Sequence, residues 1–153
     1  MLWEQFRSLA LQIIRERFPS ELIKDNGDSL TFVDRRERLR FLLTENARGI
    51  TISYYGERNT VDPIFTSPSL DLATVALTLL AREGLGKLVD IEHAPDELLG
   101  PVPGTDYSIA DEDTDGFYLT HITDSSLSAE CAYFTYARAL AEASAPSLDS
   151  LRP

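Results

Sequence analysis

Apolar and polar residues alternate through the middle of the chain. Within residues 38–45, Leu39, Phe41 and Leu43 share one face and Arg38, Arg40 and Thr44 share the other. Within residues 50–55, Ile50, Ile52 and Tyr54 oppose Thr51, Ser53 and Tyr55. A period of two with one polar face is typical of an antiparallel sheet that is packed on one side and solvated on the other. Gly49 lies in the connecting turn, where we expect a positive φ. Two further strands are predicted, Ser29–Asp34 before this pair and Pro63–Thr66 after it.

Pro63 predicts where the strand Pro63–Thr66 lies in the sheet. Proline has no amide hydrogen to donate to a neighbouring strand, so it is found mainly in edge strands. We therefore expect an edge strand here.

Three segments have helical spacing. Residues 2–18 carry a broad apolar face, and Pro19 ends that helix. Ser67 and Pro68 predict the start of a second helix, with a hydroxyl cap followed by proline at the first helical position. This helix is apolar over more than half of its surface, which favours a central place over the sheet. The third is Ser128–Ala143, with Cys131 facing inward.

The remaining segments are shorter. Residues 20–28 are polar, and their Asn26-Gly27 pair predicts a turn. Lys87–Pro103 is irregular, with a helical turn predicted at Pro95–Leu99. Tyr107–Ala110 and Phe117–Ile122 predict a hairpin around the acidic segment Asp111–Gly116.

Together these elements predict an α+β fold. An antiparallel sheet, made of a meander and a hairpin, is covered by about three helices in a single domain over residues 1–143. Residues 144–153 are expected to form a flexible C-terminal tail. A chain of 153 residues is long enough to bury one substantial core.

Negative charge is concentrated in the second half of the chain. Residues 1–83 hold 11 Lys/Arg and 12 Asp/Glu, whereas residues 84–153 hold 3 Lys/Arg and 13 Asp/Glu. The balances are −1 and −10. Such a field repels nucleic acid and anionic membranes and attracts cationic partners. An acidic surface that serves only solubility is the alternative.

The composition also bears on location and cofactors. Cys131 is the single cysteine, which excludes an internal disulfide and thiol-rich zinc motifs. No apolar run reaches the roughly 18 residues of a membrane span, and the amphipathic N-terminus is not a signal peptide. We therefore expect a cytoplasmic protein without a cofactor.

The acidic segment Asp111–Gly116 resembles the start of a calcium loop. Aspartates at alternate positions followed by glycine allow carboxylates to converge on one cation. A helix-loop-helix calcium site also needs an acid at the twelfth position, which is Ile122 here. Predicted strands flank the segment, so an acidic hairpin tip is the favoured interpretation, and no metal site is predicted.

Other candidate sites have simple structural explanations. Gly84-Leu85-Gly86-Lys87 lacks the glycine spacing and the Ser/Thr of a phosphate loop, and it follows a helix, so we interpret it as helix termination. His93 and His121 lie outside metal-ligand spacing. Cys131 is expected to be a small core residue.

The four arginines Arg35, Arg36, Arg38 and Arg40 form the only basic cluster. Acidic residues dilute it and no aromatic side chains are interleaved, so an exposed strand face is favoured over a nucleic-acid surface. No catalytic constellation is recognised, which favours a binding protein over an enzyme, with a hydrolase that uses scattered acids as the remaining alternative.

Two segments carry a family resemblance. Residues Gly49–Leu80, with Gly56-Glu57-Arg58 after a strand and SPSLDL opening a helix, are similar to immunity proteins that neutralise NAD-degrading toxins of the tuberculosis-necrotizing-toxin type in actinobacteria. Asp113–Thr120 resembles the acidic-glycine-aromatic strand of these proteins. The resemblance implies an antitoxin with a toxin as its partner. It transfers no functional residue.

The order of elements suggests an alternative. Helix, three-stranded meander, helix, two strands and helix resembles the type III secretion chaperones, which are commonly dimers that hold an extended client. This interpretation requires a homodimer with an exposed apolar groove. Topology alone is weak evidence of function.

The resulting hypothesis is an immunity protein that occludes the active site of a toxin through an acidic surface. The side chains expected at the interface are Asp111, Glu112, Asp113, Asp115 and Tyr118. Close charge pairs across such an interface couple by about 1.5–7 kcal/mol.

Overall fold

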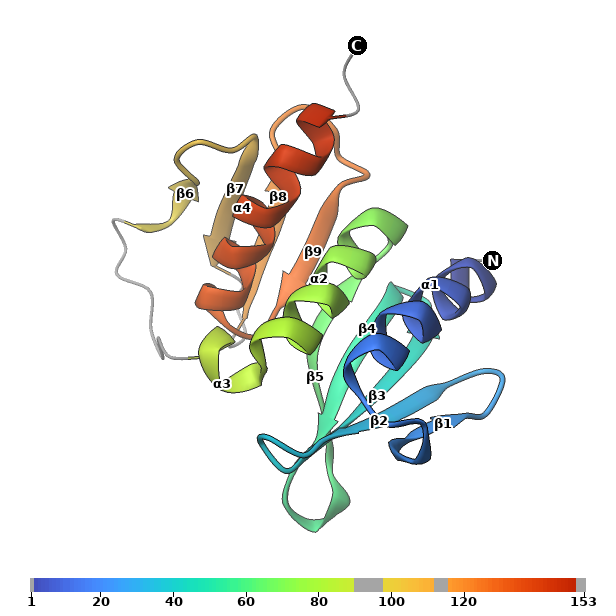
Figure 1. The fold of residues 1–153 in the computed structure, drawn as a ribbon. Coiled ribbons are helices and arrows are strands. Elements are labelled where there is room, and N and C mark those ends of the chain that lie inside the picture. Colours follow the sequence, from blue (N-terminus) through green and yellow to red (C-terminus); the bar gives the residue numbers. More distant parts are fainter. Residues whose placement is uncertain (1, 90–97, 112–115, 151–153) are drawn as a thin grey trace.

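The computed structural model describes residues 2–89, 98–111 and 116–150. Its strands form one sheet of nine in the order β1-β2-β3-β4-β5-β9-β8-β7-β6, and each neighbouring pair is antiparallel (Figure 1). The fold is α+β, as the alternation and helical spacing predicted. No helix among the described residues has the length and apolar character needed to cross a membrane.

The strands fall into an N-terminal and a C-terminal group. The N-terminal group is β1 (Ile23–Asp25), β2 (Leu30–Asp34), β3 (Leu39–Asn46), β4 (Gly49–Tyr55) and β5 (Val61–Ser67). The C-terminal group is β6 (Gly100–Pro101), β7 (Tyr107–Asp111), β8 (Phe117–His121) and β9 (Ser128–Cys131). The groups meet in the middle of the sheet, where β5 pairs with β9.

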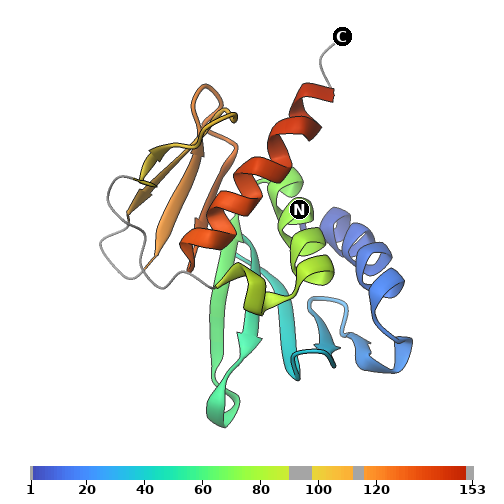
Figure 2. The ribbon, with the colours of Figure 1, turned by 60° about the vertical axis from the view of Figure 1, so that its left-hand side comes forward.

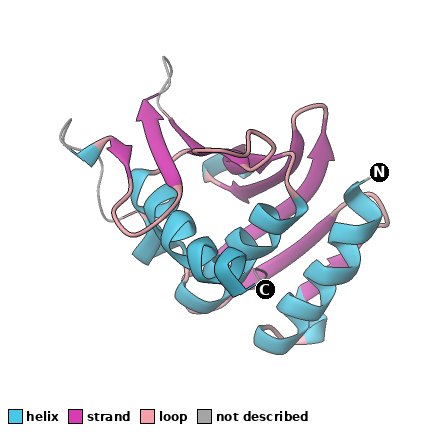
Figure 3. Cartoon of the chain, turned by 90° about the horizontal axis from the view of Figure 1, so that it is seen from above, coloured by secondary structure: helices cyan, strands magenta, loops and turns pink. Residues whose placement is uncertain are grey.

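All the longer helices cover one face of this sheet. They are α1 (Leu2–Arg17), α2 (Leu70–Glu83) and α4 (Phe134–Ser150), with the short α3 (Leu85–Leu88) after α2. Helix α2 lies between α1 and α4 (Figures 1 and 2). Seen from above, the helices gather on one side of the curved sheet (Figure 3). We call the side they pack on the covered face and the other side the open face.

The core lies between the covered face and the helices. The rings of Phe18, Phe32 and Phe41 follow one another at centroid distances of 4.9 and 5.1 Å. On α4, the buried Tyr136 hydroxyl donates a 2.6 Å hydrogen bond to the Ala76 carbonyl of α2. Burying aromatic side chains in this way supplies much of the stability of a small domain.

Two positions in the first half differ from the sequence prediction. Strand β5 is central, because it pairs with both β4 and β9. Pro63 is accommodated since the β5–β9 ladder has only two residue pairs, at Phe65 and Thr66, and does not reach it. Residues 20–28 were expected to be a polar segment with a turn, whereas Ile23–Asp25 within them form strand β1, which pairs with β2.

The start of α2 is two residues later than predicted. Ser69 is the N-cap, and its hydroxyl accepts a 3.2 Å hydrogen bond from the Leu72 amide. The Ser67 hydroxyl instead donates to the Ser128 carbonyl at 2.6 Å and accepts from the Ser69 amide. Ser67 therefore links β5 to β9, and this link takes the place of the predicted capping role.

The segment predicted as the last helix, Ser128–Ala143, forms a strand followed by a helix. Ser128–Cys131 is strand β9, because these residues fill the gap between β8 and β5. Helix α4 begins at Phe134 and continues through Ser150, so it includes part of the segment 144–153. The flexibility expected for that segment stays a prediction. Pro95–Leu99 was predicted as a helical turn, and residues 90–97 lie outside the described part of the chain.

The turn between β2 and β3 holds the C-terminal end of α2. Arg36 pairs with Asp34 at 2.9 Å and donates to the Ala81 and Arg82 carbonyls. The carboxylate of Glu37 accepts from the Leu85 and Gly86 amides at 2.5 and 2.6 Å. The Gly84–Lys87 segment therefore ends the helix, as predicted, and two of its amides bind a carboxylate of the same chain.

Candidate functional site

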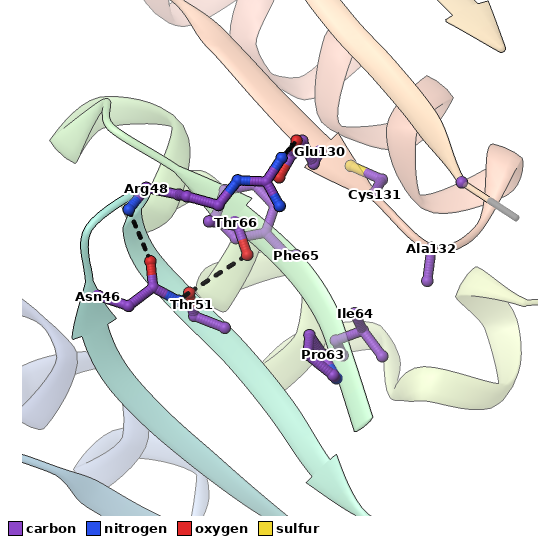
Figure 4. Close-up of a pocket in the computed structure, with 11 residues that line it drawn as sticks. Asn46, Arg48, Thr51, Pro63, Ile64, Phe65, Thr66, Glu130, Cys131 and Ala132 are labelled. Carbon is purple, nitrogen blue, oxygen red and sulfur yellow. Dashed lines mark hydrogen bonds and ion pairs between the residues drawn. The ribbon is translucent and has the colours of Figure 1, made fainter. Parts of the chain in front are cut away.

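The open face is polar and is hollowed where the two groups of strands meet. Its side chains come from alternate positions of the strands and are mostly hydroxyl-bearing or aromatic. A hollow of about 270 Å³ crosses β4, β5 and β9 (Figure 4). An adjoining one of about 240 Å³ extends towards β8. Both hollows are lined by Arg48, Thr66 and Glu130.

An irregularity in β5 contributes to the shape of this hollow. The β4–β5 register shifts between Ile52 and Ser53, which leaves Ile64 as an extra residue in β5. A bulge of this kind bends its strand and increases the local twist. Thr51 and Ser53 project from the open face and are nevertheless only 4% and 3% exposed. The open face is thus concave at β4, whereas its alternating pattern predicted a solvated surface.

Hydrogen bonds fix the turn between β3 and β4 at the rim of the hollow. The Asn46 carboxamide accepts from the Arg48 amide at 2.8 Å and donates to the Thr51 hydroxyl at 3.0 Å. The Thr51 and Thr66 hydroxyls are 3.2 Å apart and share a further hydrogen bond (Figure 4). This chain of side chains connects the turn to β5 across β4.

Gly49 allows this turn to approach β5 closely. Its φ is +128°, and a Cβ atom there would lie 2.1 Å from the Ser67 carbonyl oxygen. The positive φ predicted from the sequence is confirmed, and the close approach provides a second reason for glycine.

An ion pair crosses the hollow from one group of strands to the other. The guanidinium of Arg48, in the β3–β4 turn, pairs with the carboxylate of Glu130 on β9 (Figure 4). The Arg48 side chain is 70% exposed and that of Glu130 is 19% exposed. An ion pair with one partner this exposed contributes little to stability, about 0–1 kcal/mol.

The interface residues predicted from the sequence do not lie on one face. Tyr118 projects from the open face, is 39% exposed and lines the second hollow. Asp111 pairs with Phe117, whose ring contacts Phe134 of α4, so Asp111 shares the covered side of the hairpin.

The remaining predicted interface residues lie outside the described chain. Glu112, Asp113 and Asp115 belong to residues 112–115, so the calcium hypothesis and the acidic tip stay predictions. Gly116, which follows them, lines the first hollow.

The lining residues that sequence reasoning missed include Asn46, Arg48 and Glu130. The alternation of β4 marked Thr51 as an open-face residue, but Glu130 was assigned to a helix. Arg48 and Glu130 are 82 positions apart, and no local pattern connects them. The basic cluster also contains one aromatic contact that was not expected, since the Arg40 guanidinium lies 3.9 Å from the centroid of the Tyr55 ring.

The lining side chains suit recognition of a polar surface. They offer hydroxyls, a carboxamide, a tyrosine ring and one ion pair. Within the described ranges, no group of three or more His, Cys, Asp or Glu side chains is placed to hold a metal ion. Cys131 is buried and is one of the residues that line the first hollow, on a strand where a helix was predicted. Its register with Phe65 puts its side chain on the covered side of the sheet, in the core.

Comparison with known proteins supports the fold alone. No protein-family model matches the sequence, and no curated protein matches it. Among solved structures, Rv3902c from M. tuberculosis is similar to this chain, with a TM-score of 0.50 and 16% sequence identity. The match covers 93% of this chain and 79% of that chain. At this identity, the similarity indicates a shared architecture.

Proposed function

We propose that this protein is a non-catalytic binding domain, an immunity protein that binds a bacterial toxin domain and covers its active site. The observation that carries the proposal is the hollowed open face, which helices α1, α2 and α4 leave uncovered because they lie on the other side of the sheet. The resemblance of residues Gly49–Leu80 to immunity proteins against NAD-degrading toxins supports the choice of partner.

The side chains of the open face support a protein partner. The centre of an interface is typically enriched in tyrosine and arginine and poor in lysine and aspartate. Tyr55, Tyr118, Arg40 and Arg48 project from or border the open face, among threonine and serine hydroxyls. Tyrosine offers a large contact area and a hydrogen-bonding group for little loss of conformational entropy.

The distribution of charge supports a cationic partner. The excess of acidic residues in 84–153 gives a long-range field that accelerates encounter with a positively charged protein. The proposed roles are therefore divided. Acidic residues steer the partner towards this protein, and the open face makes the close contacts.

The test is whether this protein inhibits an NAD-degrading toxin domain of the tuberculosis-necrotizing-toxin type. The purified protein is added to the toxin at increasing ratios while the rate of NAD hydrolysis is recorded. We expect hydrolysis to stop near one equivalent, and we expect the association rate to fall as salt is raised. Unchanged hydrolysis at a tenfold excess of this protein would refute the proposal.

A further inference from the structure

The hollow around Glu130 has the properties of a site for a basic side chain. The Glu130 carboxylate lies where the two adjoining hollows meet, and it is mostly shielded from solvent. The Tyr118 ring and the Ser128 residue line the second hollow with it. A carboxylate beside an aromatic ring suits a guanidinium, which donates charge-assisted hydrogen bonds from its edge and makes π contact through its face.

The arginine that now pairs with Glu130 is weakly held. Arg48 is anchored at its backbone, through the amide that donates to Asn46, whereas its side chain extends over the hollow and is largely exposed. Because exposed ion pairs are worth little, another guanidinium can replace this one at small cost. The turn is held by the β3–β4 ladder, and Glu130 is held by the ladders of β9 with β5 and β8, so loss of the ion pair leaves both backbone segments in place.

We propose that Glu130 receives an arginine side chain of the bound protein, and that Arg48 occupies this position until the partner displaces it. The proposal rests on the function proposed above and names the chemistry by which the partner is recognised. An arginine is favoured over a lysine, since its planar guanidinium can pair with the Glu130 carboxylate and stack on the Tyr118 ring at the same time. It also fits the cationic partner that the charge of this chain attracts.

The site can be tested without the toxin. The 15N-labelled protein is titrated by NMR with acetyl-Gly-Arg-Gly-amide, and with the same tripeptide carrying citrulline, which is neutral and has nearly the same shape. We expect the arginine peptide to shift the amide signals of Thr66, Tyr118 and Glu130. The citrulline peptide should bind at least about tenfold more weakly, as for a lost charge pair.

Two variants are predicted to change the affinity for the arginine peptide in opposite directions. Glu130→Gln keeps the shape and removes the charge, and should weaken binding of the arginine peptide about tenfold or more. Arg48→Ala removes the internal competitor, and should strengthen binding by about threefold to tenfold. Glu142→Gln is the matched control, because Glu142 forms an exposed ion pair with Arg138 on α4, away from the hollow. It should bind as wild type does.

The proposal is overturned if Glu130→Gln binds as tightly as wild type, if Arg48→Ala binds more weakly, or if the citrulline peptide binds equally well. Repeating the variants with the toxin domain separates the two proposals. A toxin that is inhibited equally by wild type and Glu130→Gln leaves the immunity function standing and removes the arginine site. A toxin that wild type does not inhibit removes the function, while the peptide titration still decides the site.

Discussion

The two faces of the sheet are built from the same strands and have opposite characters. Phe65 and Thr66 are neighbours on β5, yet Phe65 packs against Tyr136 under the helices and Thr66 lines the hollow. The covered face holds the apolar core, and the open face carries hydroxyls, tyrosines and the Arg48–Glu130 pair. Alternation along a strand thus separates residues that stabilise the fold from residues that are available to a partner.

The neighbouring pair on β5 should show the largest contrast. Phe65→Ala removes a buried ring and should lower the free energy of unfolding by about 3–5 kcal/mol. Thr66→Ala removes a hydroxyl that shares one hydrogen bond with Thr51 and should cost about 1 kcal/mol. Urea denaturation followed by circular dichroism measures both. Equal losses from the two substitutions would show that the faces do not differ in this way.

The turn at the rim of the hollow should tolerate change less well than other exposed turns. Gly49→Ala adds a Cβ atom against the Ser67 carbonyl at positive φ, and should cost about 3 kcal/mol or more. Gly27→Ala is the matched control, since Gly27 also has positive φ but nothing within 4 Å of a Cβ. It should cost about 1–2 kcal/mol. If thermal unfolding gave the two variants the same midpoint, the close packing of this turn would be refuted.

The covered face should also respond to alkaline pH, through a buried tyrosine. Burial raises the pKa of Tyr107 from 10.0 to about 12, against a smaller opposite effect of the Ser144 hydroxyl. The folded protein therefore holds this proton more tightly than the unfolded chain does between pH 10 and 12. Stability is full below pH 10 and falls as the pH rises through this window. Urea denaturation at pH 9 and at pH 11 should show the loss, and Tyr107→Phe should reduce it.

Local patterns predicted most of the elements and both faces of β3 and β4. The central pairing of β5 with β9 was missed, because strands 65 or so positions apart leave no local signal. Ser128–Cys131 has small residues compatible with a helix, and its pairing with both neighbours overrides that preference. Pro63 indicated an edge strand, because proline has no amide hydrogen to donate to a neighbouring strand. In the centre of the sheet no such donor is needed at Pro63, because the β5–β9 ladder is short and does not reach it, and a bulge follows it in β5.

The candidate site was predicted less completely than the fold. Tyr118 was identified from an aromatic strand next to acidic residues, and it lines the hollow. Asp111 was placed in the same interface, but β7 and β8 turn the two side chains to opposite faces. Residues of one hairpin that are close in sequence share a face only when the strand register allows it.

The central claim is that the open face binds the partner, and Tyr118 tests it most directly. Titration calorimetry with the toxin domain should give a dissociation constant about 30-fold higher for Tyr118→Ala than for wild type, which corresponds to a loss of about 2 kcal/mol at an interface hot spot. The unfolding midpoint should stay within a few degrees. Arg138→Ala, on the far side of the sheet in α4, should bind as wild type does. An unchanged dissociation constant for Tyr118→Ala, together with weaker binding by Arg138→Ala, would place the interface on the helices and contradict this account.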